Sequence, residues 1–181
     1  MLSITSKFTK SLLGFYFLHE DESLYVNELA RRLDLDKRNL IKKLKELEKE
    51  GLFISEMRGN QKYYSLNKKF PLYKEYKKIV LKTFGFEGRL KEVLTNIKGI
   101  KRVYIYGSYA EDKMDVSSDI YIIVIGNQDT ILVQKKISQL QKLLDREINA
   151  INITENEFNL KKKNKDPFIL NLLKKKRIEI V

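Results

Sequence analysis

A Gly-Ser pair and a single aspartate, each at the end of an apolar run, are the residues most suited to chemistry. Gly107 and Ser108 directly follow the apolar run Val103–Tyr106, and ten residues separate Ser108 from Asp119. Asp119 opens a second apolar run that reaches Ile125. A strand that leads into the start of a helix presents backbone amides to an anion. The pattern therefore predicts a strand–turn–strand unit able to hold an anion. The P-loop pattern G-x-x-x-x-G-K-[ST] does not occur.

The segment YIYGSYAEDKMDVSSDIYIIVIG resembles the GS-x10-D-x-D signature of the DNA polymerase β-like nucleotidyltransferases, most of all the minimal enzymes of the kanamycin nucleotidyltransferase kind. The resemblance covers about residues 88–181 and implies a mixed sheet flanked by helices. It implies that Gly107 and Ser108 bind the triphosphate of an NTP, through close backbone approach and through the Ser108 hydroxyl. It also implies that Asp119 is catalytic and binds Mg²⁺.

Position 121 departs from this signature. The family needs two carboxylates two residues apart on one strand, where the alternation of the strand puts both on one face to bridge two Mg²⁺ ions. Tyr121 stands at the second position, and a phenol is neutral at pH 7 and a poor Mg²⁺ ligand. Glu147, in the expected strand Glu147–Ile153, is the candidate for a further metal ligand. Asp112 and Asp115 lie in the preceding loop, although nothing in the spacing requires them.

Three explanations of Tyr121 remain open from the sequence. The domain is a degenerate nucleotidyltransferase that binds a nucleotide or serves as a scaffold. Alternatively, Tyr121 is a single substitution in an otherwise active enzyme, or Asp119 and Glu147 hold a metal in an unusual geometry with a neighbour. Losing one bridging carboxylate is expected to lower the rate by roughly a hundredfold or more. The alternative to all three explanations is that the match to the family signature arose by chance in an unrelated strand–turn–strand unit.

The first half of the chain predicts three helices followed by a hairpin. The expected helices are Ser6–His19, Glu28–Leu33 capped by Asn27, and Lys37–Glu50 capped by Asp36 and stopped by Gly51. The expected extended segments are Leu24–Val26, Leu52–Met57 and Lys62–Leu66. The run YVNELARRLDLDKRNLIKKLKELEKEGLF and the later GNQKYYSLN resemble the winged-helix domains of ArsR- and MarR-like transcription regulators, over about residues 7–70.

This second resemblance implies double-stranded DNA as the partner, with the third helix in the major groove. The candidate DNA-binding residues are Lys37, Arg38, Asn39, Lys42, Lys43, Arg58 and Lys62. Arg38 is suited to a bidentate contact with guanine and Asn39 to one with adenine. Arg58 and Lys62, at the turn of the hairpin, are suited to phosphates or the minor groove. The alternative is an amphipathic helix whose lysine face is merely solvated.

Composition narrows the function classes. The 181 residues include 36 Lys and Arg against 24 Asp and Glu, a net charge of +12. Such a charge suggests a polyanionic partner, and a lysine-rich composition without functional cause is the alternative. The absence of cysteine excludes disulfides, thiol nucleophiles and Cys-based zinc sites. The one histidine, His19, excludes a His-cluster metal site and is expected at the surface. No apolar run spans a bilayer and MLSITSKFTK lacks a signal-peptide pattern, so we expect a cytoplasmic protein.

We therefore predict an α+β chain with a winged-helix domain at residues 1–70, a linker helix at 71–87 and a nucleotidyltransferase-like domain at 88–181. Further helices are expected at Asp129–Asp145, Glu155–Leu160 and Pro167–Leu173. A homodimer is expected by analogy, because winged-helix operators are two-fold symmetric. The expected function is a DNA-binding transcription regulator that carries a nucleotidyltransferase fold with a degenerate metal site. The alternative is an active enzyme that transfers NMP from an NTP, with Mg²⁺, to a protein, RNA or small-molecule acceptor.

Overall fold

The structure is a computed structural model, and it describes residues 6–115 and 117–181. Residues 1–5, part of the segment in which we looked for a signal peptide, lie outside the described ranges. The chain divides into two compact units, Met1–Gly88 and Arg89–Val181. Within the described ranges, no helix combines the length and the apolar character needed to cross a membrane.

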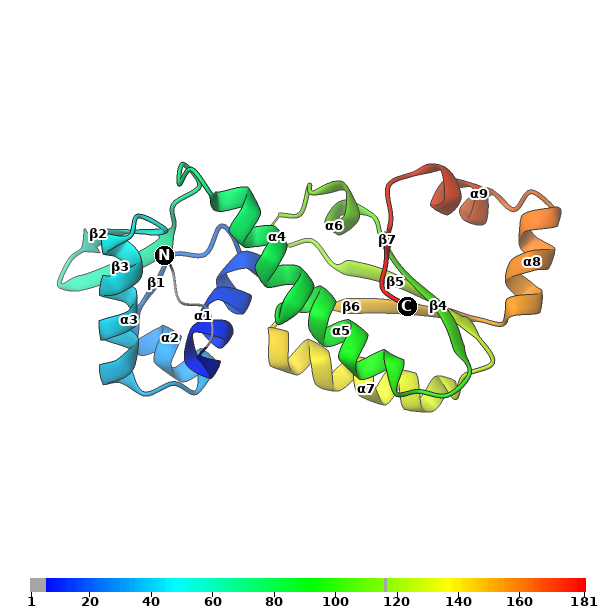
Figure 1. Cartoon of the computed structure of the whole chain (residues 1–181), viewed down its shortest axis with the longest axis horizontal. Helices are drawn as coiled ribbons and strands as arrows, with labels where there is room; N and C mark the ends of the chain where they lie inside the picture. Colours follow the sequence, from blue (N-terminus) through cyan, green and yellow to red (C-terminus); the bar gives the residue numbers. More distant parts are fainter. Residues whose placement is uncertain (1–5, 116) are drawn as a thin grey trace. The chain divides into compact units, whose positions relative to one another are not determined.

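The first unit combines helices with a small antiparallel sheet (Figure 1). Its elements are α1 (Lys7–Leu18), β1 (Leu24–Tyr25), α2 (Val26–Leu33), α3 (Lys37–Lys49), β2 (Phe53–Arg58), β3 (Gln61–Leu66) and α4 (Tyr73–Thr83). The strand order is β1-β3-β2, and both pairings are antiparallel. Helix α5 (Phe86–Thr95) runs across the boundary between the units.

The caps of the first unit explain where its helices begin. The carboxylate of Asp36 accepts a 2.9 Å hydrogen bond from the backbone N–H of Asn39, as predicted for the start of α3. The predicted Asn27 cap of α2 is wrong, because α2 begins at Val26 after Tyr25. Tyr25 is paired with Tyr63 in the sheet, so its backbone is already extended and the helix starts directly after it.

His19 is buried, and the prediction of a surface histidine is wrong. Its imidazole stacks on the ring of Phe15, one turn earlier in α1, with the ring centroids 4.5 Å apart. The backbone N–H of Glu22 donates to the carbonyl of His19, so the chain turns directly after the helix. The sequence neighbours of His19 are acidic and polar, but its ring is covered by a residue four positions before it.

Tyr16 links α1 to the sheet of the first unit. Its hydroxyl donates a 2.8 Å hydrogen bond to the carbonyl of Tyr64, and both groups are buried. The ring packs edge-on against Phe53 at 4.8 Å. Burial, the largest cause, and the nearby Glu22 carboxylate raise the pKa of Tyr16 above its ordinary value. The phenol therefore stays protonated and serves as a donor.

We predict that Tyr16→Phe lowers the stability of the first unit by about 1–3 kcal/mol, because it leaves the buried Tyr64 carbonyl without this donor. The measurement is hydrogen exchange at the amides of β3 in increasing urea. Tyr63→Phe is the matched control, since among the described residues the Tyr63 hydroxyl bonds only the exposed Gln61 side chain. It should change stability by less than about 0.5 kcal/mol. Equal effects of the two variants would contradict the assignment.

The second unit is built on a four-stranded mixed sheet. Its elements are β4 (Ile100–Tyr106), α6 (Ser108–Glu111), β5 (Ile120–Gly126), α7 (Thr130–Leu144), β6 (Ile148–Ile153), α8 (Glu155–Lys163), α9 (Pro167–Lys174) and β7 (Ile178–Glu179). The strand order is β6-β5-β4-β7; β5 and β6 are parallel, whereas β4 is antiparallel to both its neighbours. The chain therefore has the mixture of helices and strands that its sequence predicts.

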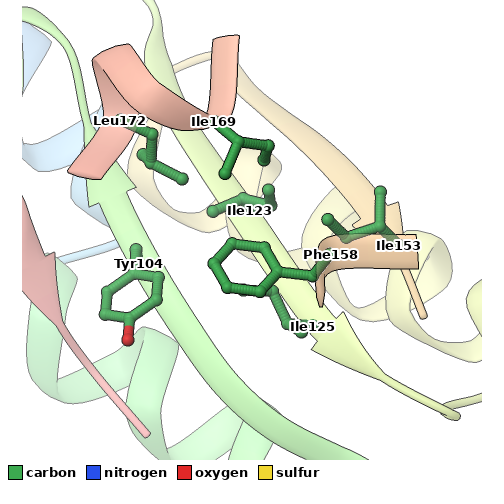
Figure 2. Close-up of a cluster of buried hydrophobic side chains, with 7 residues drawn as sticks. All are labelled: Tyr104, Ile123, Ile125, Ile153, Phe158, Ile169 and Leu172. Atoms are coloured by element: carbon green, nitrogen blue, oxygen red, sulfur yellow. The ribbon is translucent and has the colours of Figure 1, made fainter. Parts of the chain in front are cut away.

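One face of this sheet carries both a buried hydrophobic cluster and a partly exposed tyrosine, Tyr121. Ile123 and Ile125 of β5 pack with Tyr104 of β4 and with side chains from β6, α8 and α9. Figure 2 shows Ile169 and Leu172 of α9 pointing toward these strands. Because alternate residues of a strand share a face, Tyr121 and Asp119 lie on the same face, before the covered part. The helices thus cover Ile123 and Ile125, whereas Tyr121 remains 39% exposed.

Candidate functional site

The strand pairing brings the predicted chemical residues to one edge of the second sheet. Tyr106, the last residue of β4, lies opposite Tyr121 of β5. Tyr121 in turn lies level with Asn149 of β6. Gly107–Ser108 follows Tyr106 directly and Asp119 precedes β5. The turn after β4 and the start of β5 therefore meet, although ten residues separate them in the sequence.

The backbone of the Gly-Ser turn requires glycine. The backbone of Gly107 has φ 76° and ψ −153°, a conformation that residues other than glycine rarely adopt. This conformation ends β4 and starts α6 at Ser108. The Ser108 hydroxyl is half-buried and makes no hydrogen bond within residues 6–115 and 117–181. It is available to a ligand.

Asp119 is half-buried and bonded to a neutral side chain. The Asn149 amide donates a 3.1 Å hydrogen bond to Oδ2 of Asp119. An amide donor fixes the carboxylate but adds no charge to the site. The sequence pattern gave no indication of this contact between Asn149 and Asp119.

Tyr121 stands beside the Gly-Ser turn as part of an aromatic cluster. Its ring centroid lies 5.9 Å from that of Tyr106, which packs edge-on against Phe168 at 5.7 Å. A Cβ placed on Gly107 would lie 3.5 Å from Cδ2 of Tyr121, so the ring lies against the turn. Burial, and to a lesser degree the charge that Tyr121 would carry, raise the pKa of Tyr106. Tyr106 is therefore neutral, and the aromatic ring of Tyr121 stands beside it at the position where the family signature has its second carboxylate. Nothing in the sequence pattern signalled the part played by Phe168.

The other candidate carboxylates do not complete a metal site. The Glu147 side chain is exposed, and its backbone carbonyl accepts from the Ile120 N–H at 3.0 Å. Asp115 accepts 2.9 Å hydrogen bonds from the hydroxyls of Ser118 and Ser117, and these bonds lower its pKa. Its carboxylate is thus engaged in holding its own loop. Within the described ranges, no three Asp, Glu or His residues cluster as metal ligands do. The residues present do not fit a pair of bridged Mg²⁺ ions.

A second candidate site is the outer surface of α3. Leu40, Leu44 and Leu47 are buried on one face of this helix. Basic side chains at helical spacing are exposed on the opposite face. This basic stripe consists of Arg38, Lys42, Lys45 and Lys49. The predicted Lys37 and Asn39 are also exposed, at the N-terminal end of the helix. Sequence reasoning left Lys45 and Lys49 out of the candidate set, although their spacing from Lys42 was the available signal.

Three of the predicted basic residues are paired with carboxylates. The ammonium groups of Lys43 and Lys62 lie 2.7 Å from Glu46 and 2.9 Å from Glu48, and Arg58 pairs with Glu56. The pKa of Glu48 is lowered, chiefly by the hydrogen bond that Lys62 donates to it. The same hydrogen bond raises the pKa of Lys62. Lys37, Arg38 and Lys42 form no ion pair within the described part of the chain.

Sequence comparison assigns the family of the second unit. The model of the family described as Polymerase beta, Nucleotidyltransferase matches residues 88–178. The chain belongs to this family. No curated protein matches the chain.

Two solved structures align with parts of the chain. One is a toxin–antitoxin crystal structure with AMP-PNP, 26% identical with a TM-score of 0.33; the alignment covers 36% of this chain and 56% of that chain. The other is described as a nucleotidyltransferase from Sulfolobus solfataricus, 20% identical with a TM-score of 0.30, covering 41% of this chain and 68% of that one. The first alignment thus spans little more than half of its matched chain.

We predict that Gly107→Ala lowers the stability of the second unit by about 1–3 kcal/mol, because alanine is strained at this positive φ. Ser108→Ala is the matched control; it removes an unbonded hydroxyl without straining the backbone and should cost less than about 0.5 kcal/mol. Hydrogen exchange at the amides of β5 measures both. A Gly107→Ala protein as stable as the native chain would show that the turn does not require glycine.

Proposed function

We propose that this chain is a DNA-binding transcription regulator whose nucleotidyltransferase-fold unit binds a nucleotide without transferring it. The observation that carries the first part is the basic stripe of α3, which lies opposite the buried leucines and is exposed along its length. A polyanion is the partner that such a row of cations fits.

The order of elements in the first unit supports the same proposal. Helix α2 and helix α3 are joined by a short turn and are followed by the β2–β3 hairpin, the arrangement of a winged helix-turn-helix. In this interpretation α3 is the recognition helix, with Arg38 and Asn39 at the end that meets base edges. The β2–β3 hairpin is the wing, with Arg58 and Lys62 flanking its turn. The domain limits 1–70, 71–87 and 88–181 belong to this proposal.

The ion pairs of Lys43, Arg58 and Lys62 fit DNA binding by exchange of partners. Exposed ion pairs contribute only about 0–1 kcal/mol each. A DNA phosphate can therefore replace the carboxylate of Glu46 or Glu48 at little cost. Lys37, Arg38 and Lys42 need no such exchange, and we assign them the larger share of the affinity.

We further propose that the chain acts as a homodimer. Two-fold symmetric operators require two copies of the recognition helix. Two exposed apolar side chains are available to such an interface: Leu72, which caps the start of α4, and Ile79 within this helix.

We predict that the full chain binds a random-sequence DNA duplex at low salt and that Arg38→Ala/Lys42→Ala weakens this binding at least about tenfold. The slope of log K against log salt should become less steep by about 0.9 for each of the two side chains that contacts a phosphate. Fluorescence anisotropy of a labelled duplex across a salt series measures both quantities.

The control for the DNA experiment is Lys135→Ala/Lys136→Ala on α7, which removes the same net charge from another exposed helix. It should retain affinity within about twofold, since only the long-range field changes. The proposal fails if the duplex does not bind at low salt, or if the control weakens binding as much as the α3 variant.

The second candidate function is NMP transfer from an NTP. The observation that favours it is the meeting of Gly107, Ser108 and Asp119 at one edge of the family's sheet. Tyr121 and the lack of a ligand cluster within the described ranges weigh against it.

We predict that the native chain, given Mg²⁺ and radiolabelled NTPs, labels neither itself nor bulk RNA, because Asp119 alone does not hold the metal pair. Tyr121→Asp places a second carboxylate on the face of Asp119 and should bring Mg²⁺-dependent labelling, a gain of roughly a hundredfold or more over background. Autoradiography of the products measures the transfer. Labelling by the native chain that disappears in Asp119→Asn would establish the enzyme instead.

A further inference from the structure

Two lysines stand just before strand β7, at positions that its register with β4 directs toward the Gly-Ser turn. Strand β7 runs antiparallel to β4, and Ile178 lies opposite Ile105. Lys176 and Lys175 stand two and three residues before Ile178. Because paired antiparallel chains run in opposite directions, these two positions advance past the end of β4, toward Gly107 and Ser108.

The segment that carries these lysines is anchored. The Arg177 guanidinium donates a 2.6 Å hydrogen bond to the carbonyl of Leu173, at the end of α9. It also lies over the ring of Tyr104, 5.4 Å from the centroid. Arg177 therefore holds the short connection between α9 and β7, and this connection includes Lys175 and Lys176.

A third lysine, Lys113, is bonded to the turn through its backbone. The backbone N–H of Lys113 donates to the carbonyl of Ser108 at 2.9 Å, and its ammonium group lies 3.1 Å from the Glu111 carboxylate. The hydrogen bond from Lys113, followed by the charges of Lys113, Lys175 and Lys176, lowers the pKa of Glu111. All three lysines thus act on one carboxylate of α6, the helix that starts at Ser108.

We propose that the second unit binds the phosphate groups of a nucleotide without a divalent cation, with Lys113, Lys175 and Lys176 in the place of the metal charge. The proposal rests on the nucleotide binding proposed above and names its chemistry. The phosphates lie at the Gly107–Ser108 turn, where the free Ser108 hydroxyl donates to them. The three ammonium groups neutralise them, and Tyr121 occupies the space that a bridging metal would need.

The charges at the site explain why lysines can replace the metal ions there. A paired carboxylate site repels phosphate unless metal ions lie between them. With a tyrosine in place of a carboxylate at 121 and an amide bonded to Asp119, that repulsion is reduced. Ammonium groups then make direct charge-assisted hydrogen bonds to phosphate oxygens. Such a site holds a nucleotide but lacks the Lewis acid needed to transfer it.

The test is calorimetric titration of the full chain with ATP, and with GTP, CTP and UTP in parallel, in EDTA and again in excess Mg²⁺. We expect a dissociation constant in EDTA that is equal to, or lower than, the value in Mg²⁺, since Mg²⁺ screens the phosphates from the lysines. Affinity should fall as monovalent salt rises, because the lysines are exposed.

Lys175→Ala/Lys176→Ala should weaken binding in EDTA at least about tenfold, because the variant cannot form two of the charge-assisted hydrogen bonds. Its matched control is Lys162→Ala/Lys163→Ala, a second adjacent exposed pair at the end of α8, which Figure 1 shows apart from α6 within the second unit. This control should bind as the native chain does. Circular dichroism of each variant checks that it is folded.

The outcomes separate this inference from the proposed function. Binding that requires Mg²⁺ overturns the metal-free site while leaving nucleotide binding in place. Binding in EDTA that is equally weakened by both lysine pairs overturns the assignment of Lys175 and Lys176. Absence of binding to every NTP in both solutions overturns the nucleotide-binding part of the proposed function together with this inference, and leaves DNA binding to its own test.

Discussion

The pairing of β5 with both of its neighbours is the constraint on which the second unit depends. Alternation along β5 puts Asp119, Tyr121, Ile123 and Ile125 on one face, and the register with β4 sets Tyr106 opposite Tyr121. The later residues of this face pack under α8 and α9, and the earlier ones remain for the site. A slip of one residue would move both sets to the other face, so the buried isoleucines hold the site in register.

In the first unit, the buried face of a helix fixes the direction of its charged residues. Helix α3 buries Leu40, Leu44 and Leu47 against its own unit, and the same helical period turns the basic stripe outward. Burial of the leucines therefore fixes the direction in which the cations point. The carboxylates of Glu46 and Glu48 pair with lysines beside the stripe and not with its N-terminal members, Arg38 and Lys42. The cations most suited to a polyanion are thus those that the fold leaves without an acidic partner among the described residues.

Much of this arrangement can be predicted from the sequence because it is local. The apolar periods of α3 and α7, the Asp36 cap and the turn after β4 all depend on residues within a few positions of one another. Long-range pairing defeats such reasoning. The start of α2 is set by the pairing of Tyr25 with Tyr63 in the sheet. The burial of His19 was missed for a different reason: its ring stacks on Phe15, one turn earlier, although its sequence neighbours are acidic. In the sequence, Lys175 and Lys176 are only basic residues that follow a helix. Their relation to Ser108 becomes visible only through the register of the two-residue strand β7 with β4.

A site in which lysines stand where a metal charge belongs has different physical properties from one that bridges two ions. A bound metal ion polarises phosphate oxygens and can activate an attacking hydroxyl, whereas an ammonium group only neutralises charge and donates hydrogen bonds. In the site that we propose, the change at position 121 therefore removes the chemistry of transfer without removing the means to hold phosphate. A nucleotide that is held and not consumed can report its own concentration for as long as it is bound. Under the proposed function this is the property that a regulator needs, and it gives a physical reason for the presence of such a unit on the same chain as the basic stripe of α3.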